Sequence, residues 1–146
     1  MKKIRWAEVT SHYTGKPYEL GKNDCFRVLV NILREIGINI PNDMEIDGIN
    51  FDNYMKLWQE SPSRAKELMI KFAESIADEV SLGQRRTGDL VLLTVASNYK
   101  DSCYFPFVGL QVGNKIISAT KEFGARAYKL NYFNTHRVFR LREENR

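Results

Sequence analysis

Two apolar runs joined by a two-residue turn constrain the fold of this chain of 146 residues more than any other feature. The runs are FVGLQV (107–112) and KIISAT (115–120), and Gly113-Asn114 stands between them. Gly and Asn suit the tight turns that join antiparallel strands. The sequence therefore predicts a hairpin here. A third apolar run, LVLLTVA (90–96), predicts a buried strand of the same sheet.

An amphipathic helix is predicted earlier in the chain, from Asp24 onward. Its apolar residues recur at spacings of three and four, as on a helix that packs on a core: Cys25, Val28, Leu29, Ile32, Leu33 and Ile36. Asn23 or Asp24 can cap the first turn, and Gly37 and Pro41 end the helix. Cys25 is thereby placed among the first free amides of the helix.

A second helical region follows a loop with a short helical turn at residues 42–60. Ser61-Pro62 is a good helix opening, and Gly83 is expected to close the helix. One long apolar face lies between them: Ala65, Leu68, Met69, Phe72, Ala73, Ile76, Ala77 and Val80. We expect this face to cover apolar surface within the monomer or to dock a partner.

The C-terminal tail alternates from Arg137 to Arg142 as a last strand would, with Phe139 and Leu141 on one side. Helices thus precede the sheet along the chain. The predicted class is α+β, with helices packed on an antiparallel sheet. The length fits a single domain, 1–146, with a helical insertion around 52–82.

The composition is that of a globular protein, with 43% hydrophobic and 27% charged residues. No apolar run follows the charged start MKKIRWAEVT, and no stretch approaches transmembrane length. We therefore expect no signal peptide and no membrane partner. Cys25 and Cys103 lie too far apart for a metal-ligand spacing, so we expect free thiols, no metal and no cofactor. Cys103, in a polar loop from Ser97 to about Tyr104, is expected to be incidental.

The net charge of +4 could attract an anionic partner. Its clusters, Arg85-Arg86 and the arginines of 137–142, do not form one run with interleaved aromatic residues. A solvated basic face is therefore favoured over nucleic-acid binding. Arg85 and Arg86 either line a cleft near Cys25 or remain a solvated pair, and the second is favoured.

Three motifs in order, NDCFRVLV, TGDLVLL and FVGLQVGNKIISAT, resemble the NlpC-type family of papain-fold cysteine peptidases, which cut peptide bonds in bacterial cell wall. The resemblance spans roughly residues 18–120. It implies a papain-like fold and places Cys25 on the nucleophile. It also places Gly88-Asp89 on the opening of a strand and Gly113-Asn114 on the hairpin turn.

The chain departs from the family at the positions that complete the chemistry. Phe107 stands where the family has its general-base histidine, and Ser118 where it has the residue that orients the histidine. Phe26 follows the cysteine, where the family has a small polar residue. An imidazole both generates the thiolate and returns a proton to the leaving amine, and phenylalanine does neither. The helix amides could still lower the pKa of the Cys25 thiol.

The chain has two histidines, His12 and His136. Each is a candidate base only through a geometry that the sequence does not reveal, and a surface position without chemistry is the simpler interpretation. For Cys25 the simpler interpretation is a small apolar side chain on the buried face of its helix.

Two hypotheses for the function follow. The first is a catalytically impaired NlpC-like domain, structural or cell-wall-binding, in a phage tail or prophage-like assembly. It would be made in the bacterial cytoplasm and meet other tail or hub proteins. The second is an active cysteine peptidase or amidase that cleaves peptidoglycan stem peptides. Phe107 and Ser118 favour the first.

Overall fold

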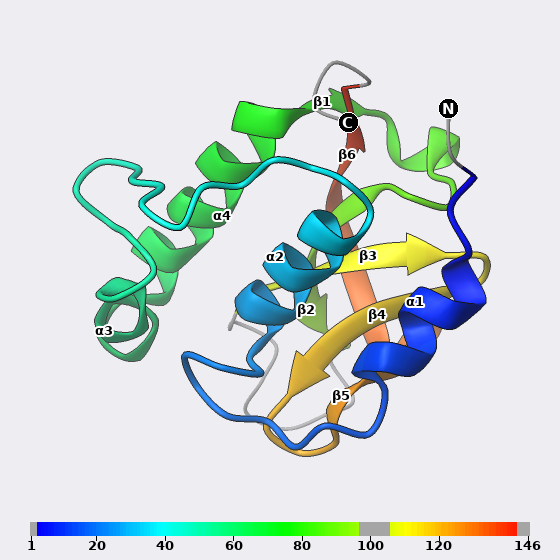
Figure 1. Ribbon diagram of the computed structural model, residues 1–146, viewed down its shortest axis with the longest axis horizontal. Helices are drawn as coiled ribbons and strands as arrows, with labels where there is room; N and C mark the ends of the chain where they lie inside the picture. The colour runs from blue at the N-terminus through cyan, green and yellow to red at the C-terminus, as the bar shows by residue number, and fades with distance from the viewer. Residues whose placement is uncertain (1–2, 97–105, 143–146) are drawn as a thin grey trace.

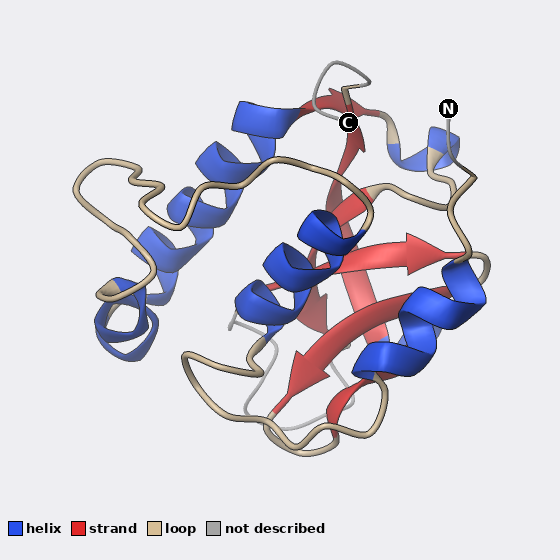
Figure 2. Cartoon of the chain, in the orientation of Figure 1, coloured by secondary structure: helices blue, strands red, loops and turns tan. Residues whose placement is uncertain are grey.

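The computed structural model describes residues 3–96 and 106–142. In these residues four α-helices come mainly before a sheet of six strands, as the sequence predicts (Figures 1 and 2). The helices are α1 (Trp6–Tyr13), α2 (Cys25–Glu35), α3 (Tyr54–Glu60) and α4 (Pro62–Ile76). The strands are β1 (Ala77–Val80), β2 (Leu90–Val95), β3 (Phe107–Val112), β4 (Lys115–Thr120), β5 (Gly124–Lys129) and β6 (Phe133–Leu141). Two short 3-10 helices are η1 (Leu82–Gln84) and η2 (Leu130–Tyr132).

The sheet is antiparallel throughout, in the order β1-β6-β2-β3-β4-β5. β3 and β4 form the predicted hairpin, in which Leu110 lies opposite Ile117 and Val112 opposite Lys115. Gly113 turns the chain between them with φ of +59°. The α+β class and the three central strands are therefore confirmed.

The cysteine helix is confirmed as α2. Its cap is Asp24, whose carboxylate accepts a hydrogen bond from the Arg27 N–H at 2.8 Å. Gly37, with φ of +100°, ends it by adopting a conformation that side chains disfavour. α2 packs against β3 and β4, and Figure 1 shows it in front of these strands. Its apolar stripe faces the sheet as predicted.

The second predicted helix is shorter than expected. α4 opens at Pro62 after the cap Ser61, but it ends at Ile76 and not near Gly83. Residues 77–80 form the edge strand β1, which pairs with β6. The spacing of Ala77 and Val80 fits both a helix and a strand. These residues form a strand because their backbone groups pair with β6.

The structure contains elements that the sequence patterns did not indicate. α1 and β5 were not predicted, and the last strand, expected from Arg137, begins at Phe133. The register of β6 against β2 shifts at His136, because Leu92 lies opposite Arg137 and Leu93 opposite Thr135. This bulge breaks the alternation by which a strand is recognised.

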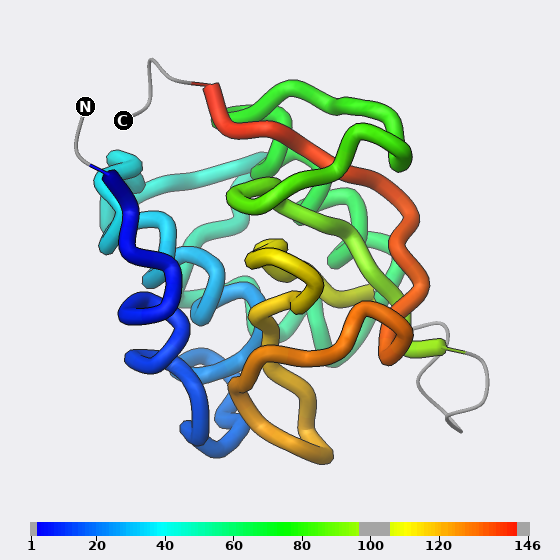
Figure 3. The backbone as a smooth tube through the Cα atoms, turned by 90° about the vertical axis from the view of Figure 1, so that its right-hand side faces the viewer, coloured from blue at the N-terminus to red at the C-terminus, as the bar shows by residue number. Residues whose placement is uncertain are grey.

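One cluster of buried side chains joins the helices to the sheet. Side chains of α2 and α4 meet one face of the central strands. Leu29 of α2 and Met69 and Phe72 of α4 lie beside Leu92 of β2 and Val108 of β3. In Figure 3, α1 and α2 (blue) lie on one side of the molecule and β6 (orange to red) runs along the other. Among the described helices, none has the length and apolarity needed to cross a membrane.

Candidate functional site

Cys25 is the first residue of α2, and its side chain is only 2% exposed. Backbone groups of Val108 in β3, of Phe26 and of Cys25 itself lie beside the thiol and act to lower its pKa. The thiol therefore lies where the start of the helix meets the first strand of the hairpin.

Asp24 supports this corner of the fold from within the core. Its carboxylate is 1% exposed and accepts hydrogen bonds from the Gly21 N–H at 2.7 Å, the Arg27 N–H at 2.8 Å and the Tyr54 hydroxyl. A buried carboxylate needs such donors to replace water. Asp24 thus ties the loop before α2, the first turn of α2 and the start of α3 together.

The pKa of the Cys25 thiol is raised well above its ordinary value. Burial is the largest cause and the charge of Asp24 the next, while the backbone hydrogen bonds with Val108, Phe26 and Cys25 oppose them. A low dielectric and a neighbouring anion both disfavour the thiolate. The sequence left open that the helix amides lower this pKa, but burial and Asp24 outweigh them. At neutral pH Cys25 is a protonated thiol.

Tyr18 belongs to this corner, although sequence reasoning did not single it out. Burial raises the pKa of its hydroxyl, and coupling to the Cys25 thiol and to the Asp24 carboxylate raises it further, so the phenol lies near both. Tyr18 is placed by long-range pairing of the preceding loop. Gly15 N–H donates to the Ala125 carbonyl of β5, and the Ala125 N–H donates to the Lys16 carbonyl, both at 2.8 Å. No local pattern signals such a contact.

His12 lies at the far end of α2 from Cys25. Its Nδ1 is 2.5 Å from Oε1 of Glu35, the last residue of the helix. Eleven residues of α-helix span about 16 Å, so the imidazole is far beyond hydrogen-bond reach of the thiol. His12 is a surface residue paired with a carboxylate.

His136 is also held away from Cys25. It is exposed at the bulge in β6, and its Nε2 is 2.7 Å from the Thr94 hydroxyl of β2. β2 separates β6 from β3, so the backbone of β6 lies about 10 Å from that of the strand beside Cys25. The described structure therefore brings neither histidine to the thiol.

Phe107 and Ser118 have structural contacts in the sheet. The Phe107 ring is buried with its centre 6.0 Å from that of Phe133. The Ser118 hydroxyl donates to the Val108 carbonyl at 2.7 Å. Ser118 thus supports the residue next to Cys25 from the other side of the strand, but it orients no imidazole.

Phe26 forms the centre of an aromatic cluster. Its ring lies 6.0 Å or less, between centres, from the rings of Phe51, Tyr54, Trp58 and Phe72. These partners come from α3, α4 and the loop before them. The side chain after the cysteine therefore anchors the helical insertion and does not line an open cleft.

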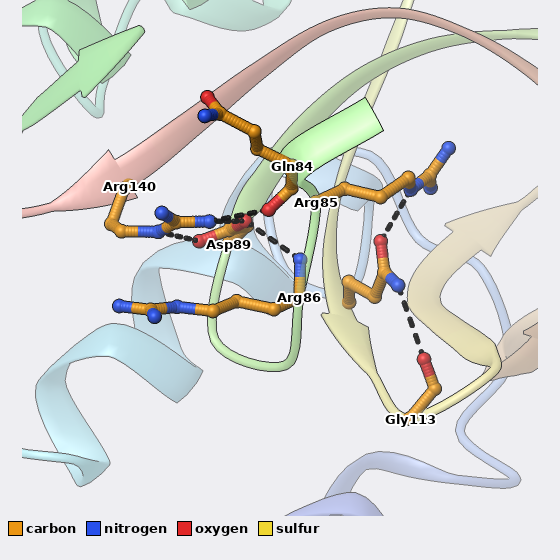
Figure 4. Close-up of polar contacts among 7 residues, drawn as sticks. Gln84, Arg85, Arg86, Asp89, Gly113 and Arg140 are labelled. Atoms are coloured by element: carbon orange, nitrogen blue, oxygen red, sulfur yellow. Dashed lines mark hydrogen bonds and ion pairs between the residues drawn. The ribbon is translucent and has the colours of Figure 1, made fainter. Parts of the chain in front are cut away.

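Arg85 and Arg86 do not form the solvated pair that the sequence favoured. Arg85 donates from Nε to the Gln111 side chain at 2.6 Å and from Nη1 to the Thr135 hydroxyl at 2.8 Å. Figure 4 shows its side chain turned away from that of Arg86. Its partner Gln111 in turn donates from the side-chain amide to the Gly113 carbonyl at 3.1 Å. Arg85 therefore links β3 to β6 through its hydrogen bonds and does not line a cleft beside Cys25.

A second polar network lies beside it, around the buried carboxylate of Asp89 (Figure 4). Asp89 accepts two bonds from Arg140, at 3.1 and 3.0 Å, and one from the Arg86 N–H at 2.9 Å. Arg140 also donates to the Gln84 carbonyl at 2.7 Å. Asp89, the second residue of the Gly-Asp pair before β2, thus joins β2 to β6, and Arg140 extends the network to η1.

In the part of the chain that the structure describes, no three His, Cys, Asp or Glu side chains gather in a way that could hold a metal ion. Cys103 and the polar loop around it lie outside the described residues. A comparison with protein-family models finds no match for this chain, and a comparison with curated proteins finds no matching relative.

Proposed function

We propose that the chain is a papain-fold domain of NlpC type that has lost catalysis and serves as a structural or cell-wall-binding component of a phage tail or prophage-like assembly. The observation that carries the proposal is the state of Cys25. The thiol stands at a helix start beside β3, where the family has its nucleophile, but it is buried, its pKa is raised and neither histidine is near.

The arrangement of the scaffold supports the family part of the proposal. The cysteine helix precedes the sheet in the chain and packs on it, the Gly-Asp opening leads into β2, and the hairpin of β3 and β4 follows. The backbone of Val108, the residue after Phe107, lies beside the Cys25 thiol and acts to lower its pKa. The family's histidine position, Phe107, is thus next in the chain to the residue whose backbone lies beside the thiol.

The chemistry supports the loss of catalysis. Amide cleavage by cysteine needs a thiolate to attack the carbonyl and an acid to protonate the leaving amine. The protonated thiol of Cys25 is a weak nucleophile, and the rings of Phe107 and Phe26 supply no proton. Both rings are buried in contacts that stabilise the fold.

The proposal is tested by incubating the protein with purified peptidoglycan and measuring soluble peptides and newly exposed amino groups. Wild type and Cys25→Ala should release the same background amount. Purified tail particles, analysed by mass spectrometry, should contain the protein if it is a structural component. Phe107→His with Ser118→His should produce at most weak release, because Cys25 remains buried and the pKa of its thiol remains raised.

Release that depends on Cys25 would establish the competing function, a cysteine peptidase or amidase. The variants His12→Ala and His136→Ala would then identify the base. Equal release by wild type and Cys25→Ala, together with absence from particles and no sedimentation with peptidoglycan, would contradict the structural role.

A further inference from the structure

The edge strand β5 borders a groove of about 260 Å³ that has a distinct chemistry. Lys115, Arg126 and Lys129 line it, together with the aromatic rings of Phe123 and Tyr132. Phe123 is 47% exposed and is one of two large hydrophobic side chains so exposed in the described chain. The groove therefore combines positive charge with accessible apolar surface.

No acidic side chain lines this groove, and its cations have no ionic partner within the described residues. The Arg126 guanidinium lies over the rings of Phe123 and Tyr128, 5.8 and 5.9 Å from their centres. These contacts hold it in place without neutralising it. The charge of the groove is thus available to an anionic partner.

The backbone of β5 is available as well. The outward N–H and C=O of Ala125 are occupied by Lys16 and Gly15. Because strand residues alternate, the N–H and C=O of Ala127 and the N–H of Lys129 also point away from β4, whereas the Lys129 carbonyl belongs to the first turn of η2. No described segment covers them. Three hydrogen-bonding groups at this edge can therefore pair with an added strand.

The opposite edge of the sheet is protected in a different way. β1 has four residues, and its acidic side chains are bound by the chain itself, Glu79 by Arg137 and Asp78 by Arg142. Short strands with charges at the edge resist unwanted pairing. The cations of β5 repel another basic strand but attract an acidic one. Protection of the edge would not require an exposed apolar ring such as that of Phe123.

We propose that the edge of β5 is a docking site for an extended acidic segment of a partner protein, added as a seventh strand. The backbone of the segment pairs with Ala127 and Lys129. Arg126 and Lys129 project from opposite faces of β5, so acidic side chains on either face of the segment meet a cation. Its apolar side chains contact Phe123. This inference goes beyond the proposed function and does not depend on the chemistry of Cys25.

The test uses the fluorescein-labelled peptide Asp-Val-Glu-Val-Asp-Glu and fluorescence anisotropy at low salt. The peptide should bind, a version with lysine at the acidic positions should not, and a version with N-methylated backbone amides should bind at least about tenfold more weakly. Arg126→Gln with Lys129→Gln should weaken binding about tenfold, because two exposed ion pairs are lost. Ala127→Pro should weaken it too, since proline removes an outward N–H without breaking a bond to β4.

The matched control is Lys56→Gln with Lys66→Gln, which changes the net charge equally on α3 and α4 and should leave binding unchanged. Melting temperatures of all variants confirm that they fold. Absence of binding, or equal binding of the N-methylated peptide, would overturn strand addition. Tighter binding of a single-stranded oligothymidylate than of the peptide would assign the groove to nucleic acid and would also overturn the proposal.

Discussion

At the scale of single residues, Cys25 shows two opposing influences on one thiol. The backbone amides at the start of α2 favour the thiolate, as helix N-termini do. Burial and the adjacent carboxylate of Asp24 favour the thiol, and they prevail. The same cysteine position can therefore hold a nucleophile or a core side chain, depending on how much water reaches it.

This balance predicts how stability depends on pH. An unfolded thiol has a pKa of about 8.5, whereas the folded Cys25 keeps its proton to higher pH. The folded state then binds more protons, so the free energy of unfolding falls as pH rises above about 8.5. The slope approaches about 1.4 kcal/mol per pH unit by pH 10. Urea unfolding between pH 7 and pH 10 measures it.

The comparison is with Cys25→Ala, both proteins carrying Cys103→Ser so that Cys25 is the only thiol. The alanine variant lacks the titrating group, so its stability should fall less steeply above pH 8.5. Below that pH the two curves should run parallel, because the contribution of the thiol is fully present there. Identical slopes in the two proteins up to pH 10 would show that the thiol is not protected from ionisation.

At the scale of elements, the aromatic cluster around Phe26 explains how the helical insertion is held. Phe72 of α4 packs on Phe26 with ring centres 5.2 Å apart and planes at 80°, an edge-to-face contact. Phe72 also faces the sheet beside Leu29 and Leu92. The apolar face of α4, which the sequence assigned to the monomer or to a partner, is thus buried within the monomer.

Phe72→Ala should therefore lower the free energy of unfolding by about 3 to 5 kcal/mol, through lost burial and the cavity that remains. Lys66→Ala, an exposed change on the same helix, should alter it by less than about 0.5 kcal/mol. Chemical denaturation of both variants measures the difference. A stable Phe72→Ala monomer that has lost a binding partner would instead assign this face of α4 to an interface.

At the scale of the whole molecule, the buried pair of Asp89 and Arg140 joins strands that are far apart in the sequence. Asp89 is 2% exposed at its side chain and Arg140 is 28% exposed. The neighbouring pair of Glu79 and Arg137 also links two strands, but Glu79 is 47% exposed. Water can replace Arg137 as a partner more readily than it can replace Arg140.

The two arginines therefore form a matched test of burial. Arg140→Gln should destabilise the protein by about 2 to 4 kcal/mol, because it leaves a buried carboxylate without its cation. Arg137→Gln should have an effect of about 1 kcal/mol or less, as is usual for an exposed ion pair. Thermal and urea unfolding of the two variants compares them. Equal effects would mean that Asp89 gains water when Arg140 is removed.

The local patterns of the sequence determined the elements with strong periodicity. The stripe after Asp24 and the runs around Gly113 specified α2, β3 and β4, because helix and hairpin formation depend on neighbouring residues. The weakly patterned elements were not predictable. Residues 77–80 became a strand only by pairing with β6, and the bulge at His136 concealed the first half of β6.

The state of the candidate site was decided by the tertiary structure alone. The sequence marked Cys25 and the absence of histidine at Phe107, but it contained no measure of how deeply the thiol is buried. That burial depends on α2 packing against β3 and on the cluster of Phe26 with the insertion. The positions of His12 and His136 depend on contacts with Glu35 and Thr94. Such contacts join distant segments, and solvent exclusion, which sets the pKa of the thiol, exists only once they have formed.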